Sequence, residues 1–199
     1  AYLGAAHAWR CGFGDGMLIS VHESTVRERI SAYIRSFRPH VVFTHAPEPD
    51  YGAAPTCNGA CPASPSLPNW AHNWDDLGYH PDHQRVGWHV LNAVYTGGSS
   101  ADNDRLFREL AEAAGLHSWK VPQLYFFALT AGQGSGQASL THYVALTEAE
   151  LKVKADACAY HRSQYHGPPL EGIKWVGARV ATAANLSPGA WAEGFRAFF

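Results

Sequence analysis

The sequence predicts an α/β protein in which a mostly parallel sheet is flanked by helices. Segments with helical spacing of apolar residues alternate along the chain with short apolar runs that are typical of strands. No internal repeat interrupts this alternation. A length of 199 residues and a hydrophobic content of 46% are sufficient for a buried core. We therefore expect residues 1–199 to form a single globular domain.

The first helix and strand are predicted between residues 25 and 45. Thr25 followed by Glu28 is the pattern of a capping box, and apolar residues then recur at helical spacing until Pro39. These signals predict a helix over about 25–37. The run 40–45, HVVFTH, is short, apolar and rich in β-branched residues, so it predicts a strand buried on both faces.

A long loop is expected over about 46–77, where prolines and glycines are frequent and no period is sustained. Cys57 and Cys61 lie within it in a C-x3-C pattern. A disulfide between them, two free thiols, and a zinc site that would need further ligands are all open interpretations. The low charge and high aromatic content fit a secreted protein or another oxidising compartment.

The second half of the chain continues the alternation of helices and strands. Helical spacing returns around 86–94 and again over 103–114. Two strands are predicted, and the capping-box pair Thr147 and Glu150 then opens a helix that extends to about residue 164. The strands are expected at 123–130 and 141–146. For the C-terminal segment we expect a loop followed by a short helix over about 188–198.

The sharpest motif is the tetrad His80-Pro81-Asp82-His83. At this composition the tetrad is expected by chance only about 0.002 times. Pro81 suits the first turn of a helix, where its missing N–H has no partner, so His80 becomes the cap and His83 lies in the same turn. Gly87 would let this helix approach the sheet closely. The alternative is a helix start whose histidines merely bond to backbone groups.

Five segments of the chain, in the correct order, resemble the PIG-L/LmbE-like deacetylase family. GFGDG at 12–16 resembles the family's Asp-Gly turn, and RPHVVFTH at 38–45 resembles one of its strands. WDDLGY at 74–79 is followed by HPDHQRVG at 80–87. Lys154 followed after six residues by His-Arg-Ser-Gln at 161–164 resembles a further family helix.

This resemblance implies a Rossmann-like domain that uses Zn²⁺ to remove the acetyl group of an N-acetylglucosamine-type sugar. By the same resemblance, His83 binds the zinc ion, and His80 stabilises the oxyanion or donates a proton. Asp82 would orient an imidazole. The residues expected to contact the sugar are Asp15, Trp74 and Tyr79.

One family motif, His-Pro-Asp-Asp, does not occur in these 199 residues. In the family it supplies two zinc ligands and a general base. We therefore expect a separate amino-terminal segment or chain to hold this motif and the first strand or strands of the sheet. The other hypothesis is a non-catalytic binding or scaffolding subunit that keeps the fold without a complete metal site.

Charge and hydropathy exclude other partner classes. The formal net charge of −2 gives no reason to expect nucleic acid, and no apolar run is long enough to cross a membrane. The expected partner is an N-acetylated sugar or glycoconjugate.

Overall fold

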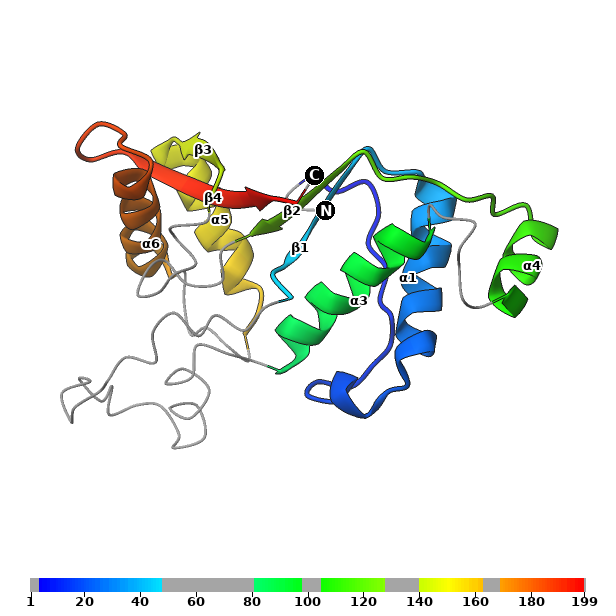
Figure 1. The fold of residues 1–199 in the computed structure, drawn as a ribbon. Coiled ribbons are helices and arrows are strands. Elements are labelled where there is room, and N and C mark those ends of the chain that lie inside the picture. Colours follow the sequence, from blue (N-terminus) through cyan, green and yellow to red (C-terminus); the bar gives the residue numbers. More distant parts are fainter. Residues whose placement is uncertain (1–3, 48–80, 98–104, 128–139, 163–168, 199) are drawn as a thin grey trace, which may run out of the picture.

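The computed structural model describes residues 4–47, 81–97, 105–127, 140–162 and 169–198. They form an α/β fold in which helices flank a four-stranded sheet (Figure 1). This confirms the expected fold class. The loop predicted over 46–77 lies almost entirely outside these residues.

The secondary structure agrees with the expected elements up to α5, with ends shifted by a few residues. In chain order, the elements are η1 Leu18–Ser20, α1 Glu23–Phe37, β1 Val41–His45, α3 Pro81–Gly97, α4 Arg105–Ala113, β2 Gln123–Phe127, β3 His142–Leu146, α5 Glu148–Ala159, α6 Leu170–Ala183 and β4 Trp191–Ala197.

Two helix starts test the capping predictions. Thr147 and Glu150 form the expected capping box at α5, because each side chain bonds the other residue's backbone N–H. The hydrogen bonds that the backbone N–H and the hydroxyl of Thr147 donate to its carboxylate lower the pKa of Glu150. The capping box predicted for the first helix is wrong. α1 begins two residues before Thr25, and His22 caps it by accepting a bond from Ser24 N through Nδ1 at 3.3 Å.

The strands lie in the order β1-β2-β4-β3. β1 and β2 are parallel, with Phe43 opposite Tyr125, whereas β4 is antiparallel to both β2 and β3. The prediction of a mostly parallel sheet is therefore wrong for the strands that the structure describes. The reason is β4, which inserts between β2 and β3 with the opposite direction.

The C-terminal segment differs most from the prediction. Residues 191–197 form β4 and not the expected helix. Alternate residues are buried there, as is typical of a strand: Ala192 is 1% exposed, and Gly194 is also buried. The preceding helix α6 is an element that the sequence signals did not predict. Its apolar face, with Ile173 and Val180, has helical spacing, but Gly172 and Gly177 weaken the helix signal.

The main core lies between helices α1 and α3 and one face of β1 and β2. Its buried members are Ile34, Leu91, Ala93, Val94, Val121, Leu124 and Phe126. A second cluster joins α6 to β4 through Val180, Ala181 and Ala192. The two helices α1 and α3 run side by side against the sheet (Figure 1).

The prediction that β1 and β2 are buried strands is confirmed for β2 and wrong in part for β1. β2 is well covered, since Leu124 and Phe126 are 0% and 1% exposed. β1 is buried only on the face of Thr44; Val41 and Phe43 on its other face are 38% and 55% exposed. The prediction of a strand buried on both faces is thus wrong for β1, because the face of Val41 and Phe43 is only partly covered.

No helix in the part of the chain that the structure describes is both long and apolar enough to cross a membrane.

Candidate functional site

Two histidines from distant segments meet where β1 ends and α3 begins. His45 is the last residue of β1, and His83 lies in the first turn of α3. Their imidazole rings stack with centroids 4.4 Å apart and planes inclined by 9°. The HPDH motif predicted a site at His83, but the sequence analysis missed His45. The available signal was its position at the carboxyl end of a predicted strand, where α/β proteins bind ligands.

Gly87 explains how the two histidines come together. A Cβ atom at this buried glycine would lie 2.4 Å from the carbonyl oxygen of His45 and 2.9 Å from the carbonyl carbon of Ala46. The backbone of α3 therefore touches the end of β1 directly, which confirms the predicted close approach. Because His83 precedes Gly87 by about one turn on the same helix, it is held over His45.

His45 lies in a largely apolar environment. Its ring contacts Phe127, the last residue of β2, with centroids 4.4 Å apart and an angle of 62°. Its Nδ1 atom is buried and has no hydrogen-bond partner among the described residues. Burial, and then the charge of His83, lowers the pKa of His45 to about 4. The imidazole of His45 is therefore neutral near pH 7 and has a lone pair available to a ligand.

Asp82 connects α3 to the loop that precedes η1. Its carboxylate accepts hydrogen bonds from the backbone N–H groups of Gly16, at 2.6 Å, and Leu18, at 3.2 Å. These bonds bring the turn that contains Asp15 to the first turn of α3. The turn that contains Asp15 thus lies near Asp82 and His83. The orientation of an imidazole by Asp82 and a contact between Asp15 and substrate stay predictions.

The donors at this site fit a zinc ion in part. Imidazole is a common zinc ligand, and the structure places His83, the predicted ligand, against the ring of His45. A catalytic zinc ion takes about three protein ligands. Within the described ranges, no group of three or more His, Cys, Asp or Glu side chains could hold a metal ion. A zinc ion here would therefore need a ligand from elsewhere.

The remaining predicted site residues lie outside the described part of the chain, so their placement is untested. They are His80, Trp74, Tyr79 and the proposed pair Cys57 and Cys61. Two other cysteines, Cys11 and Cys158, are free thiols.

No family model and no curated protein matches the sequence. Among solved structures, the N,N'-diacetylchitobiose deacetylase from Pyrococcus horikoshii matches with a TM-score of 0.66 over 99% of this chain, at 18% identity. The fold is deacetylase-like. A conserved protein from Thermus thermophilus matches with a TM-score of 0.58 over 100% of this chain, at 20% identity. The chain spans 59% of the length of the deacetylase and 68% of the second protein.

Proposed function

We propose that this protein is a zinc-dependent N-deacetylase that hydrolyses the acetamide of an N-acetylglucosamine-type substrate. The observation that carries this proposal is the place of the HPDH motif. In a deacetylase-like fold, the motif begins a helix whose His83 stacks on His45 at the carboxyl end of a strand. Ligands of α/β proteins bind at this end of the sheet.

In the proposed mechanism, His83 would hold the metal, which would supply the acidified water needed for attack on an amide carbonyl. The neutral ring of His45 fixes the orientation of His83 by stacking, and the start of α3 presents the positive end of its dipole to developing negative charge. His80, the predicted cap of α3, stabilises the oxyanion.

The loop on the other side of the site would bind the sugar. Asp82 holds this loop against α3 through Gly16 and Leu18, so the position of Asp15 depends on the same helix that carries His83. We propose that Asp15 accepts hydrogen bonds from sugar hydroxyl groups. Trp74 and Tyr79 would stack on the sugar face.

We further propose that another polypeptide segment, on this chain or on a separate one, completes the sheet along β1 and supplies the missing carboxylate ligands. The place of β1 at the edge of the described sheet and the 55% exposure of Phe43 support this proposal. Unpaired strand edges and exposed aromatic side chains favour the addition of a strand.

The second candidate is a non-catalytic binding or scaffolding subunit. It is favoured by the absence of a three-ligand metal group from the described residues. Metal analysis separates the two candidates. About one equivalent of zinc per protein supports the enzyme. A metal-free protein that does not acquire zinc on dialysis supports the scaffold.

The decisive experiment compares His83→Ala with His80→Ala in preparations that contain the completing segment. His83→Ala should lose both zinc and deacetylation of a chitooligosaccharide, because the metal loses a ligand. His80→Ala should keep its zinc, while kcat falls about 10²–10³-fold through loss of oxyanion stabilisation. Full zinc content and full activity in His83→Ala would refute the assignment.

A further inference from the structure

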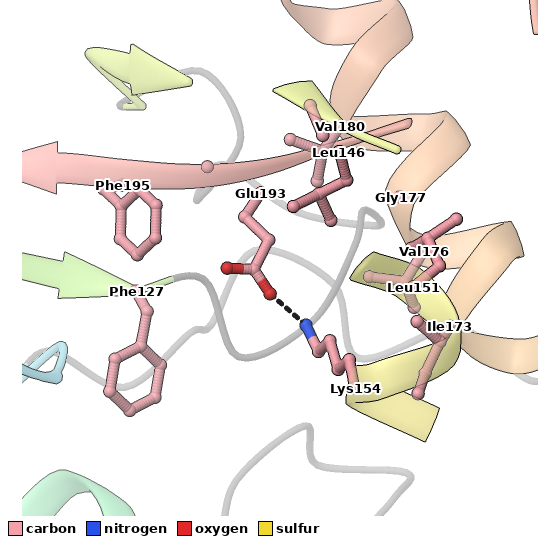
Figure 2. Close-up of a pocket in the computed structure, with 12 residues that line it drawn as sticks. Phe127, Leu146, Leu151, Lys154, Ile173, Val176, Gly177, Val180, Glu193 and Phe195 are labelled. Atoms are coloured by element: carbon pink, nitrogen blue, oxygen red, sulfur yellow. Dashed lines mark hydrogen bonds and ion pairs between the residues drawn. The ribbon is translucent and has the colours of Figure 1, made fainter. Parts of the chain in front are cut away.

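A cavity of about 230 Å³ lies between the sheet and helices α5 and α6. Figure 2 shows Phe127 and Phe195 on one side of it and residues of α5 and α6 on the other. The aliphatic side chains in its wall are Leu146, Leu151, Ile173, Val176 and Val180. Most of the wall is therefore unable to bond to a polar ligand.

The charged groups in the cavity neutralise each other. Lys154 Nζ, from α5, donates a hydrogen bond to Glu193 Oε1, from β4, and the two form an ion pair between the aromatic and the aliphatic walls (Figure 2). A charged ligand would have to compete with this pair. An uncharged apolar group would leave the pair intact and would displace water from the aliphatic wall.

The size of the cavity fits a small hydrophobic group. An apolar cavity of about 150 Å³ is sufficient for a benzene molecule. At about 230 Å³, this one has room for a phenyl ring or a short alkyl chain. A sugar ring fits less well, because its hydroxyl groups would meet aliphatic carbon on most sides.

Phe127 links the cavity to the candidate active site. Its ring lines the cavity and also contacts the ring of His45, which in turn stacks on His83. Through Phe127, the cavity and the candidate active site thus share one side chain.

We propose that this cavity binds an alkyl or aryl substituent of the substrate, such as the aglycone of an N-acetylglucosaminide. The proposal rests on the function proposed above. It adds a specificity: the preferred substrate would be an amphipathic glycoside and not a purely hydrophilic oligosaccharide.

The binding test uses a probe that lacks the amide, so that it does not require the enzyme to be a deacetylase. Hexyl β-D-glucopyranoside should bind in calorimetric titrations, whereas methyl β-D-glucopyranoside should not. Val176→Phe and Ile173→Phe each fill part of the cavity and should weaken hexyl binding at least about tenfold. The control is Leu110→Phe, on α4. Leu110 is 62% exposed and does not line the cavity, so this variant should bind like the wild type.

Two filling variants are used so that a folding defect in one does not decide the result. Each is first compared with the wild type by thermal unfolding, and one folded variant is sufficient. If the wild type does not bind the hexyl glycoside, or if folded filling variants bind it as well as the wild type does, the inference is wrong.

Turnover then separates the two proposals. The wild type, with its metal and the completing segment, should deacetylate hexyl N-acetyl-β-D-glucosaminide with a kcat/KM about ten times or more that for the methyl glycoside. Val176→Phe should abolish this preference, and Leu110→Phe should keep it. If the protein binds the hexyl glucoside but deacetylates neither the hexyl nor the methyl N-acetylglucosaminide, the proposed function is wrong and the cavity proposal stands. Equal turnover of both glycosides would overturn the cavity proposal alone. A preference for chitobiosides over hexyl glycosides would do the same.

Discussion

Replacement of Gly87 by alanine should destabilise the protein although alanine is the better helix former. The added Cβ would lie 2.4 Å from the carbonyl oxygen of His45, and the obstructing atoms belong to the backbone, so no side-chain rotation relieves the contact. α3 would have to move away from β1 by roughly 0.6–1 Å, a gap that forfeits a quarter to a half of the dispersion energy across that contact. The same shift would separate His83 from His45.

The magnitude follows from two opposed effects. Overpacking costs about 1–3 kcal/mol, and the rigid backbone contact places Gly87→Ala at the upper end. The gain in helix propensity offsets about 1 kcal/mol. The net loss is about 2 kcal/mol, which lowers the Tm of a chain of this size by roughly 4–8 °C.

The assay is thermal unfolding followed by circular dichroism, with Gly172→Ala as the matched control. Gly172 is exposed in α6, and a Cβ built there meets nothing within 4 Å. Gly172→Ala should therefore raise the Tm by up to about 2–4 °C. If Gly87→Ala raised the Tm as much as Gly172→Ala, the close approach of α3 to β1 would be refuted.

Three further predictions concern capping, buried histidine and the loop at the site. Thr147→Ala should lower the free energy of unfolding by about 1 kcal/mol in urea titrations, because α5 loses its cap; an unchanged midpoint would contradict this. His89 in α3 is 2% exposed, its ring nitrogens have no hydrogen-bond partner among the described residues, and burial lowers its pKa. Since the unfolded chain then binds the proton more tightly, the stability that neutral His89 contributes is present above pH 6.5 and is lost as pH falls below it. In His89→Leu, the free energy of unfolding should fall less as the pH is lowered. If the wild type and His89→Leu showed the same slope of unfolding free energy against pH, the reasoning would be refuted. Asp82→Ala should cost about 1–3 kcal/mol and speed amide hydrogen exchange at Gly16 and Leu18, whose bonds it removes; unchanged exchange would exclude the link.

Local signals in the sequence account for much of the fold. The capping box at Thr147 and the apolar period of the helices up to α5 depend on residues close in sequence, and the structure contains them where expected. Pairing between distant strands has no such local signal. The sequence predicts a helix in place of β4 because the alternation there is short and contains a glycine, whereas the place of β4 between β2 and β3 depends on both partners.

The candidate site shows the same difference between residues with a local sequence signal and residues whose role depends on distant segments. His83 is predictable because it belongs to a contiguous motif with a helix start. His45 is missed because its role arises only when Gly87 brings α3 onto the end of β1. The half-exposed face of β1 is also missed, since an apolar run alone does not tell how many of its faces are covered.

The position of β4 has a consequence for biosynthesis. A ribosome synthesises a chain from its amino end, so β1 and β2 can pair before residues 191–197 have been made. β3 pairs with β4 in the described sheet, so it can join the sheet only after these residues emerge. Until residues 191–197 have been synthesised, β3 therefore lacks its described partner strand and the β4-facing edge of β2 is uncovered. During this interval the polypeptide is most open to chaperone binding and to self-association.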